Sequence, residues 1–319
     1  MQTKMTKRYD VIVVGELNVD LILNQVEKFP VVGKEVLASQ MTLTLGSSSA
    51  IFASNLNTLG SPVTYIGKLG QDNFGDHIVN ALRGKGVDTG NIIFSISEAT
   101  GASIILNFME DRAMVTYPGA MSNLTIHDIT DEALLSAKHL HVSSVFLQLG
   151  LKPDLVQLFK RAKDLGLTTS MDPQWDPAEV WDLPLSELLP YVDVFMPNVT
   201  ELKALTKTYD LDTAIQSINK LGNIIVIKDG NKGAYLCEGE TVVYQPAFLN
   251  TKVVDSIGAG DSFDAGFIHC FVQGQPGKAC LEFGAVMGAV NTTRSGGTGA
   301  FEKVALVKEI AQSSFNYTF

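Results

Sequence analysis

The residues with the most chemical potential lie in one stretch, 253–271, which reads VVDSIGAGDSFDAGFIHCF. A strand pattern ends at Asp255, a glycine-bearing loop follows, and an apolar helix is expected to begin around Asp261. Gly258 and Gly260 allow a ligand to approach the backbone, and amides at a helix N-terminus stabilise anionic oxygens. The Asp261 carboxylate would repel a phosphate, but it can accept a proton from a hydroxyl that attacks phosphorus. The pattern is therefore compatible with phosphoryl transfer to an alcohol.

The same spacing also fits a structural interpretation. Aspartate is a common helix N-cap, and glycine is common in the turn before a helix. The stretch is neither the G-x-x-x-x-G-K-[ST] phosphate loop nor the dinucleotide pattern G-x-G-x-x-G. The spacing alone leaves both interpretations open.

Alternating strand and helix patterns surround this stretch. Continuous apolar runs typical of buried parallel strands occur at 9–14, 139–146, 167–172, 193–198 and 224–230. Helical patterns lie between them, at 49–59, 75–84 and 153–165. This order predicts one α/β domain over residues 1–319, with a mostly parallel sheet covered on both sides by helices.

Two segments interrupt the alternation. Residues 34–45 and 102–117 have strand-like patterns with no helix between their strands. They predict a small antiparallel sheet that projects from the main domain. The exposed face and edge of such a sheet need cover, and a second copy of the chain would supply it, so we expect a homodimer through this sheet.

Composition limits the possible partners. The 319 residues include 24 Lys and Arg against 34 Asp and Glu, a net charge of −10 without charge blocks. Such a chain is a poor candidate for binding nucleic acid or an anionic membrane. Cys237, Cys270 and Cys280 show neither metal-ligand spacing nor a framework of pairs, and no signal peptide or membrane span is evident. We therefore expect a cytoplasmic protein.

The segment DSIGAGDSF at 255–263 resembles the second signature of the ribokinase (PfkB) carbohydrate kinases, D-T-x-G-A-G-D, with Ser256 in place of threonine. The resemblance extends along nearly the whole chain. Further matching segments are GELNVD (15–20), GKLGQDNFGDHIVNALRGKGVDT (67–89), TGASIIL (100–106), PGA (118–120), NVTE (198–201) and IKDGNKGA (227–234). It implies a ribokinase-like three-layer α/β/α sandwich with a small β-sheet lid formed by about 16–45 and 100–118.

The resemblance assigns roles to residues around ATP. Asp261 would be the catalytic base, with the amides of Gly258, Ala259 and Gly260 as an anion hole for the transferring phosphoryl group. Glu201 would hold Mg²⁺ through water, and without the resemblance it would be interpreted as an ordinary first-turn glutamate. The remaining implied contacts with ATP are Asn198 to the phosphates, Lys228 and Gly230 under the nucleotide, and Gly297 beside adenine. Lys228 could equally be an exposed residue at a strand end.

The resemblance also implies a monovalent-cation site, for example for K⁺, at Asp255 and the carbonyl of Ile257. On the acceptor side it implies Asp20, Gly46, Ser47 and Arg112 as sugar-binding residues.

The acceptor side also departs from the family pattern. In G-G-x-x-x-N the second glycine is Ser47 and the sugar-contacting asparagine is Ile51. The usual D-P-N-x-R stretch reads DPQWD at 172–176 and lacks the arginine. Isoleucine cannot form hydrogen bonds with hydroxyls, so the wall of the acceptor pocket at this position must be apolar or rebuilt by serines. These departures leave the identity of the sugar open.

Three functions remain. The first is a kinase for fructose or a similar ketose, ribose or 2-keto-3-deoxygluconate. The second is a nucleoside or pyrimidine-alcohol kinase, which an apolar wall at Ile51 would suit. The third is a non-catalytic sugar-binding sensor, which would not need Asp261, Asn198 and Glu201. His139 and His141 could share one face of a strand, but no third metal ligand accompanies them, so a structural role is expected.

Overall fold

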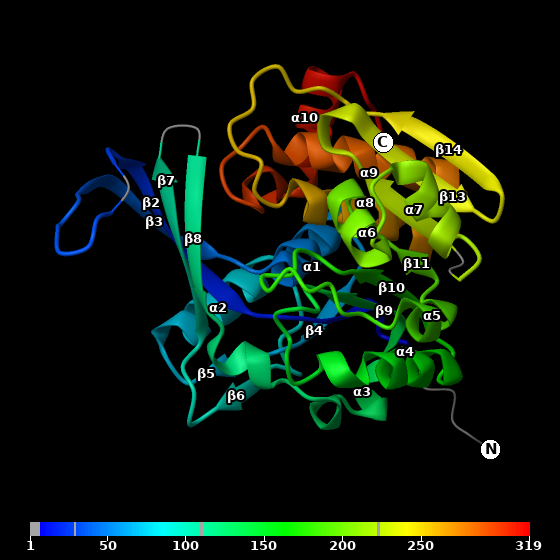
Figure 1. The fold of residues 1–319 in the computed structure, drawn as a ribbon, viewed down its shortest axis with the longest axis horizontal. Coiled ribbons are helices and arrows are strands. Elements are labelled where there is room, and N and C mark those ends of the chain that lie inside the picture. Colours follow the sequence, from blue (N-terminus) through cyan, green and yellow to red (C-terminus); the bar gives the residue numbers. More distant parts are fainter. Residues whose placement is uncertain (1–6, 29, 109–110, 222–223) are drawn as a thin grey trace.

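The structure, a computed structural model, describes residues 7–28, 30–108, 111–221 and 224–319. Its central element is an eight-stranded sheet (Figure 1). Strands β12 to β4 of this sheet run parallel, and β13 and β14 form an antiparallel hairpin at one edge. In spatial order the strands are β14 (Thr241–Pro246), β13 (Gly233–Glu238), β12 (Ile224–Lys228), β11 (Val194–Phe195), β10 (Thr168–Asp172), β9 (Ala137–Ser143), β1 (Tyr9–Val14) and β4 (Val63–Ile66).

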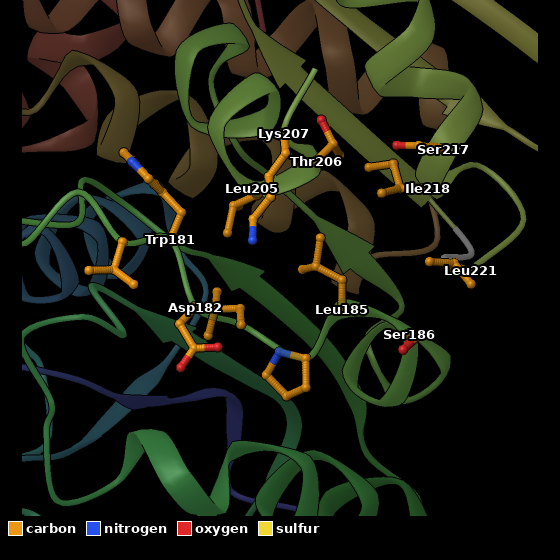
Figure 2. A pocket seen from close by; sticks show the side chains of 13 residues that line it. Trp181, Asp182, Leu185, Ser186, Leu205, Thr206, Lys207, Ser217, Ile218 and Leu221 are labelled. Atoms are coloured by element: carbon orange, nitrogen blue, oxygen red, sulfur yellow. The ribbon is translucent and has the colours of Figure 1, made fainter.

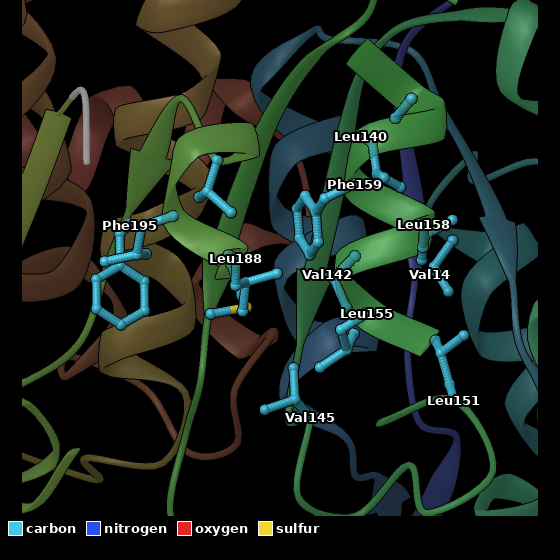
Figure 3. Packing of buried hydrophobic residues seen from close by; sticks show 14 of the residues in the cluster. Val14, Leu140, Val142, Val145, Leu151, Leu155, Leu158, Phe159, Leu188 and Phe195 are labelled. Carbon is cyan, nitrogen blue, oxygen red and sulfur yellow. The ribbon is translucent and has the colours of Figure 1, made fainter. Parts of the chain in front are cut away.

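Helices cover both faces of this sheet because its strands are apolar on both faces. Ile12 and Val14 of β1 belong to one core, Val11 and Val13 to the other, and all four are fully buried. The helices whose apolar residues join the first core are α3 (Asp131–Leu135), α4 (Leu155–Asp164), α5 (Leu185–Leu188), α6 (Val199–Thr206) and α7 (Leu211–Ile218). Figure 3 shows Leu155, Leu158 and Phe159 of α4 beside Leu140 and Val142 of β9.

The second core is formed with α1 (Ser48–Leu59), α2 (Asn73–Gly84), α8 (Ala259–Val272) and α9 (Gly277–Asn291). Helix α10 (Val304–Phe315) packs on α9. Short 3-10 turns complete the connections: η1 (Gly119–Asn123), η2 (Ile126–Asp128), η3 (Lys152–Asp154), η4 (Leu189–Tyr191), η5 (Gly230–Lys232) and η6 (Gly299–Phe301). The three-layer α/β/α architecture confirms the predicted fold class.

Two details of the main sheet differ from the prediction. The strand expected at 193–198 is only Val194–Phe195, because Pro197 cannot donate to a ladder and Asn198 already caps α6. The β13–β14 hairpin was not predicted from the sequence, although its turn contains Gly239 in the left-handed region, at φ 57°.

A separate four-stranded sheet, called the lid below, projects from the main domain (Figure 1). Its order is β3 (Ala38–Leu45), β2 (Asn18–Val26), β7 (Gly101–Phe108) and β8 (Asp111–Tyr117). The outer pairs are antiparallel as expected, but the central pair β2–β7 is parallel, because these strands come from distant parts of the chain. A further small sheet pairs β5 (Lys68–Gly70) with β6 (Ile93–Ser95).

The two faces of the lid differ in character. Asp20 pairs with Thr44 and Ser103, and Ser103 pairs with Thr116, which places four polar residues side by side on one face. One position further along each strand, the opposite face carries Leu21, Leu43, Ile104 and Val115.

None of the helices in the described ranges has the length and apolar character needed to cross a membrane.

Candidate active site

The glycine-bearing loop leads into the N-terminus of α8, as the sequence predicts. Gly258 is the N-cap, in the left-handed region at φ 74°, where a side chain would be strained. Among the described residues, the backbone amides of Gly258, Gly260 and Asp261 have no hydrogen-bond partner, whereas the amide of Ala259 donates to the Ser256 carbonyl at 3.2 Å. Free amides at the start of a 14-residue helix form a site suited to an anion.

Glycines set the position of α8 against α9. A Cβ atom built on Gly266 would lie 2.6 Å from the Cγ atom of Met287, and one on Gly284 would lie 3.0 Å from the Phe263 carbonyl. Phe263 and Phe267 then pack into the second core. The helix that carries Asp261 is therefore held by close backbone packing rather than by exposed contacts.

Asp261 itself is buried, with 7% of its surface exposed, although it lies in the first turn of α8. Its Oδ1 atom accepts a hydrogen bond of 2.9 Å from the Nε2 atom of Gln174. Burial and the neighbouring carboxylate of Asp172 raise the pKa of Asp261 to about 7, against the opposing effect of Lys228. A carboxylate with a pKa near neutrality is suited to exchange protons with a substrate.

Lys228 is not an exposed strand-end residue. Its Nζ atom donates to Oδ2 of Asp172 and to Oδ2 of Asp264, both at 2.8 Å, and only 12% of its side chain is exposed. Although burial opposes the charge, Asp172 and Asp264 raise the pKa of Lys228. This ion triad joins β10, β12 and α8, and it lies beside the anion site, because a Cβ atom on Gly260 would be 3.9 Å from Nζ.

Asn198 and Glu201 form a capping box at the start of α6. The Asn198 side chain accepts from the Glu201 amide, and the Glu201 carboxylate accepts from the Asn198 amide, each at 2.9 Å. Glu201 is nevertheless 4% exposed, unlike an ordinary solvated first-turn glutamate. Burial and Asp172 raise its pKa to about 7.

A cavity of about 320 Å³ adjoins the α8 N-terminus. Lys228, Gly230 and Gly260 are among the residues that line it. The rest of its wall comes mainly from small or apolar residues, among them Ala247, Phe248, Val253, Phe263, Ala285, Gly288 and Ala289. A larger hollow of about 510 Å³ lies elsewhere, around Trp181, Leu185, Lys207 and Ile218, and none of the predicted site residues lines it (Figure 2).

Gly297 and Ile51 lie against the glycine-bearing loop. A Cβ atom on Gly297 would be 2.4 Å from Cδ1 of Ile51, and one on Gly258 would be 3.0 Å from Cγ2 of Ile51. Ile51 is 3% exposed. Gly297 is absent from the wall of the 320 Å³ cavity. Ile51 thus packs against and supports the glycine-bearing loop, a contact that the sequence did not predict.

Three predicted acceptor residues, Asp20, Gly46 and Ser47, lie where the lid meets the main domain, whereas Arg112 lies beside the β7–β8 turn at the other end of the lid. Gly46 lies so close to Asp20 that a Cβ atom would be 2.4 Å from Oδ1 of Asp20. Asp20 also accepts a hydrogen bond of 3.0 Å from Asn18. Burial raises the pKa of Asp20 to about 6, despite that bond. Arg112 is in β8 opposite Asn107, and its side chain lies outside the described part of the structure.

Two serines near the predicted acceptor residues form hydrogen bonds with Glu16. Ser47 adopts a left-handed conformation, φ 68°, where the family pattern has glycine, and its hydroxyl donates to the Glu16 carbonyl at 2.6 Å and caps α1. Ser49 donates to the Glu16 carboxylate and contacts the Ser143 hydroxyl at 2.6 Å. Burial raises the pKa of Glu16, against the bonds from Ser49.

Asp255 and Ile257 organise the other side of the loop. The Asp255 carboxylate accepts from the amides of Ile257 and Gly296, both at 2.9 Å. The Ile257 carbonyl accepts from Asn291 at 2.6 Å. These contacts hold the loop before α8, where the monovalent-cation site is predicted, against the segment around Gly296.

Sequence reasoning missed four contributors to this site: Glu16, Asp172, Gln174 and Asp264. Asp172 and Gln174 belong to the altered D-P-N-x-R stretch, which drew attention only for its lost arginine. Asp264 lies three residues after Asp261 and therefore on the same side of α8, a spacing that could have revealed it.

Comparison with known proteins finds a family match and several similar kinases. The model of the pfkB family carbohydrate kinases matches residues 8–304. A deoxyribokinase from Salmonella typhi is 29% identical over 311 residues, which cover 94% of this chain and 98% of that protein. The structure of Arabidopsis thaliana ribokinase complexed with ribose and ATP has a TM-score of 0.84 and 26% identity, covering 96% of this chain and 99% of that one. A putative ribokinase II from E. coli, in complex with ATP and Mg²⁺, shares the fold at a TM-score of 0.82 and 23% identity, with coverage of 95% and 99%.

Proposed function

Since the chain belongs to the pfkB family of carbohydrate kinases, we propose that it transfers the γ-phosphoryl group of ATP to a sugar hydroxyl, with Asp261 as the general base. The observation that carries this proposal is the buried Asp261 carboxylate in the first turn of α8, beside backbone amides that have no partner among the described residues. Base and anion site are thus rigidly joined.

In the proposed step the acceptor hydroxyl gives its proton to Asp261 as its oxygen bonds to phosphorus. The bond from phosphorus to the bridging oxygen breaks at the same time, and ADP leaves. The amides of Gly258, Gly260 and Asp261 stabilise the charge on the phosphoryl oxygens. The amide of Ala259 contributes less than the resemblance implies, because the Ser256 carbonyl already occupies it.

The 320 Å³ cavity fits the adenosine part of ATP. Its mainly apolar wall suits a flat base, and Lys228 and Gly260, which also line it, lie at the anion site. Gly297 acts from outside this cavity, through the Ile51 contact that supports the loop. The Lys228 charge is shared by Asp172 and Asp264, so its effect on the phosphates would be weaker than that of a free lysine.

Glu201 and Asn198 are the residues that would hold Mg²⁺ near the phosphates. The Glu201 carboxylate is buried and raised in pKa, so a cation beside it would offset the cost of its charge. Bound Mg²⁺ would neutralise phosphate charge during transfer. Asp255 and the Ile257 carbonyl would hold a monovalent cation such as K⁺, which would relieve the same kind of local negative charge.

We propose a neutral sugar as the acceptor, ribose or a ketose such as fructose rather than an acid such as 2-keto-3-deoxygluconate. Among the described side chains around Asp261, carboxylates of Glu16, Asp172 and Glu201 accompany a single cation, Lys228, which is already paired. A carboxylate on the acceptor would add repulsion without a partner. The Asp20 carboxylate can instead accept hydrogen bonds from adjacent hydroxyls, with Gly46 leaving room for them.

The apolar face of the lid fits a homodimer. Met41 and Val115 are 69% and 70% exposed, and Leu43 and Ile104 lie on the same face. Burying this face against a second copy would remove apolar surface from water and cover the sheet edge. The three free cysteines fit a reducing compartment such as the cytoplasm.

An ADP-release assay over ribose, deoxyribose, fructose, 2-keto-3-deoxygluconate and nucleosides tests the acceptor. We expect kcat/KM for a neutral sugar to exceed that for the sugar acid by at least about tenfold, as for one unpaired charge. Asp20→Ala should raise the KM for the sugar about 5- to 150-fold, a loss of about 1–3 kcal/mol, and leave the KM for ATP nearly unchanged. Preference for the sugar acid, or equal weakening of both substrates, would contradict this assignment.

A further inference from the structure

The loop after β10 has an unusual backbone. Gln174, Glu179 and Trp181 all lie in the left-handed region, with φ of 59°, 53° and 57°. Each such residue other than glycine costs about 1 kcal/mol or more, so the conformation persists only where the surroundings enforce it.

Buried contacts enforce it here. Asp176, which is 4% exposed, accepts hydrogen bonds from the amides of Ala178, Val180 and Trp181 at 2.9, 3.0 and 2.7 Å. The Trp181 ring packs edge-on against Phe146 and Trp175, with centroids 5.6 and 5.0 Å apart. Trp181 is also shown at the edge of the larger hollow in Figure 2. The loop is therefore a rigid support.

This support places the Gln174 side chain between two carboxylates. Its Nε2 atom donates to Oδ2 of Asp172 at 2.6 Å and to Oδ1 of Asp261 at 2.9 Å. Only the amide nitrogen can donate to a carboxylate, and both of its hydrogens are used, so the orientation of the amide is determined. Asp172 is in turn fixed by Lys228 at 2.8 Å.

We propose that Gln174 is a positioning residue for phosphoryl transfer: it holds one oxygen of Asp261 and leaves the other to receive the proton of the acceptor hydroxyl. This inference rests on the proposed role of Asp261 as base. The charged and polar groups that surround Asp261 from other elements are Glu16, Ser48, Asp172, Lys228 and Glu201. Without Gln174, the Asp261 carboxylate loses the donor that selects its rotamer and separates it from Asp172.

Gln174→Gly and Gln174→Asn test the inference, because glycine and asparagine both tolerate a left-handed backbone. Glycine removes the side chain, and asparagine keeps the amide one methylene too short. For both variants we expect kcat to fall about 10- to 100-fold, as for a misplaced reacting group, with the KM values for sugar and ATP within about threefold. Glu179→Gly is the matched control, since it makes the same backbone change at an exposed position in the same loop, and its kcat should match the wild type.

A double-mutant cycle with Asp261→Asn separates this inference from the proposed function. If Gln174 acts through Asp261, Gln174→Gly should lower kcat less than about threefold when Asp261 is already Asn. An equal loss in both backgrounds, or wild-type kcat in both Gln174 variants, overturns the inference and leaves Asp261 as base intact. Wild-type kcat in Asp261→Asn itself would overturn the proposed function, and the inference with it.

Discussion

The Nζ atom of Lys228 lies 2.8 Å from Oδ2 of Asp264, a carboxylate one helical turn beyond Asp261 on α8. Together with Asp172, this contact fixes the helix that carries the proposed base to two strands of the sheet. Burial raises the pKa of Asp264 well above its usual value, against the effect of Lys228, so removing this cation would leave two buried acidic groups without a positive partner.

Lys228→Met should therefore destabilise the protein strongly. We expect a loss of about 3–5 kcal/mol in the free energy of unfolding at pH 8, measured by urea denaturation. Lys160→Met is the control, because it breaks an exposed Lys160–Asp164 pair and should leave the free energy of unfolding nearly unchanged. A loss for Lys228→Met no larger than that of the control would show that the triad does not hold α8.

The raised pKa of Asp261 predicts opposite trends for activity and stability. Because the base must be ionised, kcat/KM should rise with pH through about 7. The folded-state pKa lies above the ordinary value of 3.8, so the contribution of Asp261 to stability is full below pH 3.8 and is lost as the pH rises through about 7.

Asp261→Asn removes the cost of burying an ionised carboxylate at this position. The thermal midpoint of the variant should therefore exceed that of the wild type at pH 8, by a margin that shrinks toward pH 5. Asp164→Asn, at a well-exposed position, should show a difference that varies little over the same range. A margin for Asp261→Asn that is constant with pH would contradict the raised pKa.

Glu201→Gln tests the metal assignment without removing the start of α6, because glutamine also closes a capping box. We expect the Mg²⁺ concentration for half-maximal rate to rise at least about tenfold, since one carboxylate is lost. The thermal midpoint should change little at pH 5, where the pKa of about 7 keeps the folded-state Glu201 carboxyl group largely neutral. An unchanged Mg²⁺ requirement in Glu201→Gln would reject Glu201 as the metal residue.

The monovalent-cation site makes a separate prediction. K⁺ should stimulate the wild type, and Asp255→Asn should reduce that stimulation.

The apolar face of the lid predicts the oligomeric state. The wild type should sediment as a dimer, and Val115→Glu should sediment as a monomer at micromolar concentration, because it would bury a charge in the interface. Met114→Glu is the matched control, since Met114 is also exposed but points to the other face of β8. A monomeric wild type, or equal dissociation by both variants, would reject the lid as the interface.

Local patterns were sufficient to predict much of this site. The glycines before Asp261 and the N-x-x-E spacing of Asn198 and Glu201 each lie within one chain segment, and each segment forms the helix start that its residues favour. The strand patterns of the lid were equally local. Its parallel central pair was not predictable in this way, because β2 and β7 are brought together only by the fold.

The contacts that surround Asp261 are long-range. Gln174 is 87 residues from Asp261 in the sequence, and Lys228 is 56 residues from Asp172. No periodicity links such positions, so a Lys228 under the nucleotide and an exposed one at a strand end fitted the sequence equally well. The packing of Ile51 against Gly297 likewise joins helix α1 to a distant loop, a contact that no local pattern predicts.

The most direct test of the account is kcat for Asp261→Asn, measured with saturating ATP, Mg²⁺ and the best neutral sugar. The substitution keeps the shape of the side chain but removes its ability to take a proton. We predict that kcat falls by about 10²–10⁴ while the Kd for ATP stays within a few fold, the range typical of a lost general base. A variant that retains most of the wild-type kcat would make Asp261 a structural residue at the start of α8 and would contradict the proposed mechanism.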